Sequence, residues 1–185
     1  MSQQQSEEER ARAAVFAGHN VFLTGGAGVG KTHMLHQLIR DLRARGDKVC
    51  VTASTGIAAT ALSGTTIHAA MGMGLCDGPI DKLLKRARMR RYLSRRWQSI
   101  DVLVIDEISM VDPVFFERCD ALLQQFRACP KPFGGLQVVV SGDFLQLPPV
   151  KSEKKRLHLK QSIGSVQKFR PFVYKQCTDK QTRHS

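Results

Sequence analysis

Apolar residues in the first 150 positions follow two spacings, one typical of buried strands and the other of helices. Continuous apolar runs predict strands at 21–23, 48–53, 101–106 and 136–140. Helical spacing, capping residues and helix-forming composition predict helices at 7–16, 31–45, around 80–87 and from Asp112-Pro113 onward. Residues 55–75 are small and rich in Gly and Thr, which predicts short helices and loops. Strands that alternate with helices predict an α/β fold, with a parallel sheet flanked by helices.

The pattern divides the chain into three parts. Residues 1–19 form a polar lead-in and a first helix, and residues 20–150 carry the strand–helix alternation. Residues 151–185 lose the alternation and are basic, with ten Lys or Arg against two acids, Glu153 and Asp179.

Composition narrows the partners and the compartment. The 185 residues suffice for one domain with a core, and the net charge of +12 predicts a polyanionic partner, either nucleic acid or an anionic membrane surface. No apolar run reaches the roughly 20 residues of a membrane span. The Gln-rich, acidic N-terminus does not resemble a secretory or organellar leader. Five scattered cysteines without a C-x-x-C pair argue against zinc and predict reduced thiols inside a cell.

A glycine-rich loop joins the first predicted strand to the helix that begins at Lys31. It matches the pattern G-x-x-x-x-G-K-[ST] in full, with Gly25, Gly26, Ala27, Gly28, Val29, Gly30, Lys31 and Thr32. Glycines let successive backbone N–H groups point at phosphate oxygens, and the helix adds its positive end. The loop therefore predicts binding of ATP-Mg²⁺, with Lys31 on the β- and γ-phosphates and the Thr32 hydroxyl on Mg²⁺.

Two carboxylates follow the apolar strand at 101–106. Because ligands bind at the carboxyl ends of the strands in open α/β sheets, Asp106 and Glu107 are expected beside the glycine-rich loop. Asp106 would hold the Mg²⁺ shell, and Glu107 would orient or deprotonate the attacking water. An acidic turn in solvent is the alternative when such a pair stands alone.

Two further segments carry weaker signals. Residues 142–150 follow a buried strand, and the Gln146 amide there has three candidate partners, namely the γ-phosphate, the attacking water, or only solvent. Residues 52–59 and 64–68 offer hydroxyls and backbone N–H groups suited to phosphate contacts, although Thr and Ser also cap helices. His68 in the second of these is alternatively a core histidine.

A basic stretch between positions 82 and 96 holds eight Lys or Arg, with Tyr92 and Trp97 within or beside it. One interpretation is a surface that tracks a nucleic-acid backbone, with bases stacked on the two rings. The other is a single amphipathic helix with a solvated cationic face and both rings in the core, and this segment favours the latter.

Taken together, the motifs resemble the Pif1 family of DNA helicases in superfamily 1. The resemblance rests on Asn20-Val21-Phe22-Leu23-Thr24-Gly25 before the loop, on 52–59 and 64–68, on Ile105-Asp106-Glu107-Ile108-Ser109-Met110-Val111, and on 142–150. It covers about residues 6–150. It implies a RecA-like ATP-binding domain at 20–150 that couples ATP hydrolysis to 5′-to-3′ movement on single-stranded DNA. It further implies that Gln146 senses the γ-phosphate and that Thr55, Gly56, Thr65 and His68 lie along the DNA strand.

Three departures from the family pattern qualify these expectations. Glu9 stands where the family has an adenine-reading glutamine, and Ala69-Ala70 replaces Ser-Phe after His68. Phe172-Val173-Tyr174 resembles the strand with which the family's first domain resumes, but no second RecA-like domain follows. Since an arginine from that domain is worth on the order of 10³–10⁵ in rate, the chain alone is expected to hydrolyse ATP poorly without a second domain or a partner in trans.

The sequence thus favours an ATP-dependent DNA helicase of the Pif1 type, intracellular, in nucleus or mitochondrion if eukaryotic. The family implies roles in DNA repair, recombination and telomere maintenance. A nucleotide-gated DNA-binding or regulatory module without unwinding activity is one alternative. A kinase or clamp-loader-type ATPase is another, against which residues 142–150 argue.

Overall fold

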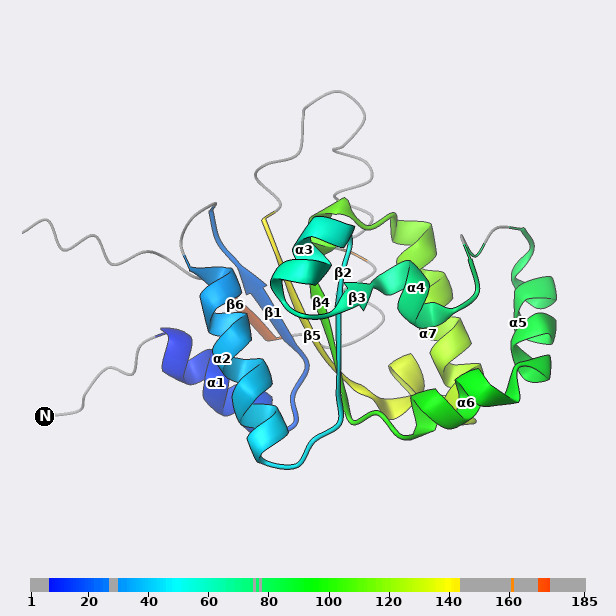
Figure 1. The fold of residues 1–185 in the computed structure, drawn as a ribbon, viewed down its shortest axis with the longest axis horizontal. Coiled ribbons are helices and arrows are strands. Elements are labelled where there is room, and N and C mark those ends of the chain that lie inside the picture. Colours follow the sequence, from blue (N-terminus) through cyan, green and yellow to red (C-terminus); the bar gives the residue numbers. More distant parts are fainter. Residues whose placement is uncertain are drawn as a thin grey trace, which may run out of the picture.

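The computed structural model describes residues 7–26, 30–74, 76, 78–143, 161 and 170–173, which form a β-sheet with helices on both faces (Figure 1). The strands are β1 (Val21–Thr24), β2 (Val49–Ala53), β3 (Thr65–Thr66), β4 (Val102–Asp106), β5 (Gln137–Gly142) and β6 (Arg170–Val173). The α-helices are α1 (Glu7–Phe16), α2 (Lys31–Ala44), α3 (Gly56–Ala61), α4 (Ile67–Met71), α5 (Ile80–Met89), α6 (Arg91–Gln98) and α7 (Pro113–Arg127). Two short 3-10 turns complete the elements, η1 (Ile108–Met110) and η2 (Pro132–Gly135).

The sheet confirms the predicted α/β fold. Its strands run in the order β3-β2-β4-β5-β1-β6, and every neighbouring pair is parallel. All carboxyl ends therefore meet at one edge of the sheet, which is where ligands bind in open α/β folds. The segments that follow β1, β2, β4 and β5 are brought together at that edge.

Both faces of the sheet are buried, which explains the continuous apolar runs of the strands. Along β4, Leu103 and Ile105 belong to a core shared with α4 to α7. Val102 and Val104, the alternate residues, belong to a second core shared with α1 and α2. Alternate residues of the strand therefore contribute to one core on each side of the sheet.

The start of α7 follows the sequence prediction. Asp112 caps the helix, because its Oδ1 accepts hydrogen bonds from the backbone N–H groups of Val114 at 3.0 Å and Phe115 at 3.3 Å. Pro113 occupies the first turn, where its missing N–H costs nothing. At the end of α2 the chain turns at Gly46, whose φ of 99° favours glycine.

The prediction of one helix through the basic stretch is wrong. The chain forms α5 and α6, separated at Arg90 with φ −98° and ψ 66°. The apolar positions alone do not require the break, because Ala87 and Leu93 are only about 120° apart around a continuous helix by the shorter way. The break lies at Arg90, whose guanidinium donates a hydrogen bond to the Gly72 carbonyl at 2.8 Å. Trp97 is in the core at 0% exposure as predicted, but Tyr92 is not, at 61%.

Two strands at the sheet edges extend the predicted set. The two-residue β3 pairs with β2 and carries Thr65. β6 pairs in parallel with β1, so part of the basic segment after residue 150 belongs to the sheet. Phe172 of this strand packs against the core beneath α1 and α2. The resemblance predicts a strand at residues 172–174. Residues 172 and 173 do lie in β6, and residue 174 lies outside the described residues.

The cysteines that the structure describes behave as small apolar residues. Cys50, Cys76 and Cys119 are buried, and Cys129 is half-buried. Burial raises the pKa of the Cys119 thiol well above its ordinary value, with the neighbouring Cys76 and Asp120 adding to the effect. A thiol held in its protonated form is a poor nucleophile and a poor metal ligand. Within the described ranges, no helix combines the length and apolar character needed to cross a bilayer.

Candidate functional site

The glycine-rich loop begins where β1 ends and closes on the first turn of α2. Gly30 caps that helix with φ 94° and ψ 12°, a left-handed conformation that favours glycine. The Lys31 Nζ donates hydrogen bonds to the backbone carbonyls of Gly25 and Gly26, both at 2.7 Å. The lysine ammonium therefore lies against the start of the loop at Gly25 and Gly26, beside the positive end of α2. Ala27, Gly28 and Val29 lie outside the described residues.

Asp106 and Glu107 stand at the carboxyl end of β4. Asp106 is 4% exposed, and its Oδ1 accepts a hydrogen bond from the Glu107 backbone N–H at 2.9 Å. Glu107 itself adopts φ 52° and ψ 42°, which costs a residue with a side chain on the order of 1–3 kcal/mol. This left-handed residue turns the chain directly into η1. The two carboxylates therefore belong to successive residues at the start of that turn.

Electrostatics join the loop and the carboxylates into one site. Burial raises the pKa of Glu107, and the negative charge of Asp106 raises it further. Lys31 lowers it, and Asp143 raises it. Charges influence each other in this way only at short range, so Lys31, Asp106, Glu107 and Asp143 share one neighbourhood. Carboxylates with perturbed pKa values often gather at functional sites.

Two oxygen donors would be available to Mg²⁺ here, the Thr32 hydroxyl and the Asp106 carboxylate. Thr32 is exposed in the first turn of α2. The part of the chain that the structure describes holds no group of three His, Cys, Asp or Glu suited to a metal.

The four residues that the resemblance places along DNA gather at the β2–β3 side of the sheet. Thr55 caps α3, accepting a hydrogen bond from the Ala58 N–H at 3.2 Å, and Gly56 is the first residue of that helix. Thr65 lies in β3, directly beside β2. His68 follows in α4 and stacks on the Phe115 ring, with centroids 3.9 Å apart. We call this group of residues the DNA-facing edge, after the role that the resemblance implies for it.

The sequence left two interpretations open for these residues, contact with phosphate or a structural role in capping and in the core, and the structure bears on both. Thr55 does cap a helix, but Gly56 and the neighbouring Ile57 are exposed, so the turn is open to a ligand. His68 is half-buried with one ring face covered by Phe115, intermediate between a core histidine and a free one. A backbone hydrogen bond from the Ser54 N–H to the Asp106 carbonyl, 3.1 Å long, links this edge to the carboxylate pair.

Asp143 is a residue of the site that sequence reasoning did not single out. It is 5% exposed and lies directly after β5, next to the strand that ends in Asp106. The signal was present, since an acid immediately after a buried strand is the same pattern that identified Asp106. Gln146, the residue chosen from that segment, lies outside the described residues.

Gly142 lets the end of β5 approach η1 closely. A Cβ added there would lie 2.9 Å from Ile108 Cγ2 and 3.2 Å from the Ser109 backbone nitrogen. Contacts this short are possible only for glycine, so the residue sets how near β5 lies to the turn that follows Glu107.

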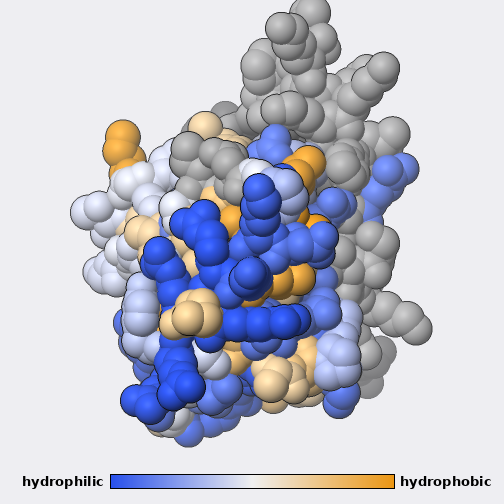
Figure 2. All heavy atoms as spheres, turned by 90° about the vertical axis from the view of Figure 1, so that its right-hand side faces the viewer, coloured by the Kyte–Doolittle hydropathy of each residue, from blue (hydrophilic) through white to orange (hydrophobic). Residues whose placement is uncertain are grey.

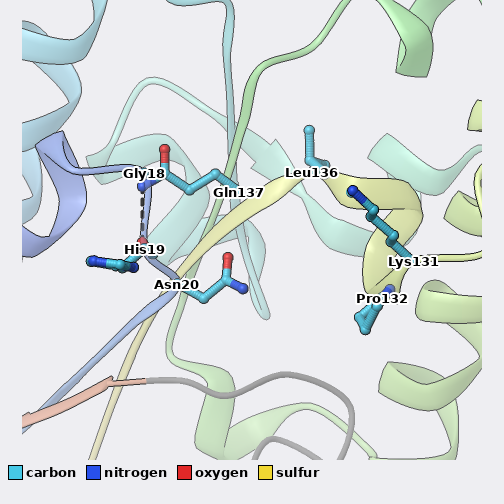
Figure 3. Close-up of a pocket in the computed structure, with 8 residues that line it drawn as sticks. Gly18, His19, Asn20, Lys131, Pro132, Leu136 and Gln137 are labelled. Atoms are coloured by element: carbon cyan, nitrogen blue, oxygen red, sulfur yellow. Dashed lines mark hydrogen bonds between the residues drawn. The ribbon is translucent and has the colours of Figure 1, made fainter.

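A cavity of about 330 Å³ lies at the other end of the sheet (Figure 3). His19 and Asn20 precede β1, and Lys131 and Leu136 precede β5, so the cavity opens at the amino ends of the strands. Much of its polar lining is engaged within the fold. Asn20 accepts from the Val138 N–H at 2.7 Å, and Gln137 donates to the carbonyls of Val15 and His19. The cavity is therefore separate from the nucleotide site.

Comparisons with known proteins agree on one family. A family model described as PIF1-like helicase matches residues 2–175. The ATP-dependent DNA helicase PIF1 of Saccharomyces cerevisiae is 45% identical over 141 residues, covering 75% of this chain and 16% of that protein. The crystal structure of Pif1 helicase from Candida albicans aligns with a TM-score of 0.78 and 35% identity, over 94% of this chain and 40% of that one.

Two structures of Pif1 from Bacteroides resemble the chain in defined states. One is bound to single-stranded DNA, with a TM-score of 0.63 and 32% identity over 87% of this chain and 36% of that one. The other is in complex with ADP-AlF4, with a TM-score of 0.67 and 32% identity over 87% and 37%. The chain spans 16–20% of the length of the first curated relatives it matches.

Proposed function

The chain belongs to the PIF1-like helicase family, and from that premise we propose that it provides the ATP-Mg²⁺-binding domain of a DNA helicase. In the full proposal, ATP hydrolysis drives 5′-to-3′ movement on single-stranded DNA. Residues 20–150 form the RecA-like part of this domain, with 1–19 as a lead-in and 151–185 as a basic C-terminal segment. Roles in DNA repair, recombination and telomere maintenance belong to the same proposal.

One observation carries the proposal. Three charged residues act on the pKa of Glu107: Lys31 at the end of the glycine-rich loop, Asp106 at the end of β4, and Asp143 directly after β5. A glycine-rich turn without a function would not need three acids and a lysine around it. A phosphate-binding loop does need them, since Mg²⁺ and the attacking water must both be held beside the γ-phosphate.

In this proposal each residue of the site takes a separate role. The backbone of the loop, Gly25 to Gly30, binds phosphate, and Lys31 exchanges its two carbonyl hydrogen bonds for phosphate oxygens. Thr32 and Asp106 hold Mg²⁺, which would neutralise charge on the phosphates. Glu107 orients the water and accepts its proton, for which a raised pKa moves it toward the working pH. Gln146 contacts the γ-phosphate.

DNA binds along Thr55, Gly56, Thr65 and His68. The hydrogen bond between Ser54 and Asp106 gives a short path by which the nucleotide site can act on this edge. A shift at the carboxyl end of β4 moves the backbone that leads into Thr55, so ATP and DNA are expected to alter each other's affinity by the same factor.

The test is the steady-state ATPase rate of the chain with and without single-stranded DNA, with Lys31→Ala as the blank and Glu107→Gln as the hydrolysis variant. The proposal expects a DNA-stimulated rate above the blank and a rate for Glu107→Gln lower by about 10²–10⁴-fold. Equal rates for the parent and Glu107→Gln would remove Glu107 from the chemistry. Nucleotide-dependent DNA affinity without any hydrolysis would favour the nucleotide-gated binding module instead.

A further inference from the structure

The side of the molecule formed by α5 and α6 carries positive charge that the nucleotide site does not use. Residues 80–98 contain eight Lys or Arg and one acid, Asp81. Figure 2 looks onto this side and shows hydrophilic side chains crowded over it. The ion pairs recorded among the described residues lie on α1, α2 and the turn after α2, and none involves α5 or α6. We call residues 80–98 with the adjoining part of α7 the α5–α6 basic surface.

A hollow of about 300 Å³ lies within this surface. Three arginines line it, Arg88 from α5 and Arg91 and Arg95 from α6. Gln125 of α7 lines it as well and accepts a hydrogen bond from Arg88 Nε at 3.1 Å. Arg91 and Arg95 are exposed and four residues apart, so their like charges face each other on one side of the helix and destabilise it. An anion placed between them would relieve that repulsion.

The surface is mounted on a rigid base. Ser94 and Gln98 of α6 both donate to the Phe126 carbonyl of α7. In the other direction, Arg127 of α7 donates hydrogen bonds to the carbonyls of Trp97 and Ile100. Helices fixed in this way need not rearrange when their arginines bind a ligand, which favours affinity.

The surface also continues from the DNA-facing edge. Arg90 donates to the Gly72 carbonyl at 2.8 Å, and Arg96 donates to the Ala70 carbonyl at 3.3 Å. Both acceptors lie in or just after α4, the helix that carries His68. Next to Arg90, the exposed Tyr92 ring offers a face on which a base can stack. A strand leaving His68 would therefore meet the α5–α6 basic surface next.

We propose that the α5–α6 basic surface binds the phosphate backbone of nucleic acid, as a second DNA contact beyond the DNA-facing edge. The proposal rests on the DNA-binding function proposed above. Planar guanidinium groups bind phosphate in a two-pronged geometry, and Arg91 and Arg95 are placed to do so from the hollow. The ligand is assigned as nucleic acid rather than an anionic membrane because the surface continues an edge already assigned to DNA.

The test compares two pairs of substitutions that remove the same charge. Arg91→Gln with Arg95→Gln removes the proposed contacts, and Arg40→Gln with Arg43→Gln removes two exposed arginines of α2, which lies across the sheet from α6 in Figure 1. Fluorescence anisotropy follows binding to a labelled single strand of about 16 nucleotides and to its duplex, at salt between about 50 and 200 mM. Vesicles containing phosphatidylserine serve as the membrane probe.

Loss of two phosphate contacts should reduce the slope of log K against log salt by about 1.8 on duplex or about 1.4 on a single strand. The α2 pair should leave the slope unchanged, and Arg91→Lys with Arg95→Lys should largely restore it because the charge is kept. Which DNA responds identifies the form that lies on the surface. Equal slopes for both Gln pairs on both DNAs would overturn the proposal, as would loss of vesicle binding alone. A parent chain that binds neither DNA would instead contradict the proposed function itself.

Discussion

Gly142→Ala tests whether β5 and the turn after Glu107 are packed as closely as the structure indicates. The added methyl carbon would lie 2.9 Å from Ile108 Cγ2, with the backbone nitrogens of Ser109 and Ile108 at 3.2 and 3.3 Å. Ile108 is fully buried, so its side chain has little room to move away, and η1 must shift with it. Overpacking of this kind costs about 1–3 kcal/mol, of which the reduced freedom of the unfolded chain offsets about 0.4–1 kcal/mol.

The expected net loss is about 1–2 kcal/mol, or about 2–8 °C in Tm for a domain of this size. Because Glu107 immediately precedes η1, a shift of about 1 Å there should lower any ATP hydrolysis by about 10²-fold while ATP affinity at the loop stays close to that of the parent. Thermal unfolding, an ATP titration and a hydrolysis assay measure the three quantities. Gly56→Ala is the matched control for stability, since its methyl would meet nothing within 4 Å. Equal Tm values for the two variants would refute the close packing.

Two further predictions concern charge and burial. Glu107→Gln should raise Tm at neutral pH, because folding raises the pKa of the Glu107 carboxyl. Such a carboxyl stabilises the folded state at pH below its ordinary pKa of 4.5. It loses that contribution as the pH rises through the raised pKa. The gain over the parent should shrink as the pH falls below that ordinary value, and a gain independent of pH would contradict the raised pKa. Trp97→Ala should lower the free energy of unfolding by about 3–5 kcal/mol, whereas Tyr92→Ala should change it by less than about 0.5 kcal/mol. Chemical denaturation measures the free energy of unfolding of both variants. Similar losses for the two would contradict the burial of Trp97 and the exposure of Tyr92.

The sequence specified the central strands β2, β4 and β5 well because they are buried on both faces. Continuous apolar runs such as Val102 to Ile105 leave no ambiguity about a central parallel strand. The glycine-rich loop and the Asp106-Glu107 pair were also evident, since each follows such a strand. Their convergence follows from the parallel topology together with the strand order, which places only β5 between β1 and β4.

Other features depend on contacts that a linear pattern does not contain. The break at Arg90 has no signal in the apolar spacing, since Leu83, Ala87, Leu93 and Trp97 belong to one core and would lie within about 120° of one another on a continuous helix. The two-residue β3 is too short to give an alternation and exists through its pairing with β2. Asp143 gains its place in the site from the strand order, which sets β5 beside β4. The left-handed conformation of Glu107 has no signal in residue type, since glycine would be expected there.

The central claim is that residues 25–32 bind ATP-Mg²⁺. Isothermal titration of the chain with ATP, in the presence and absence of Mg²⁺, tests it most directly when run beside Lys31→Ala. The account predicts saturable binding that Mg²⁺ strengthens, and a loss of at least about tenfold in affinity for the variant, since one charge-assisted contact to phosphate is worth about 1.5–3 kcal/mol. Equal affinities for the chain and Lys31→Ala would contradict the assignment of this loop as the nucleotide site.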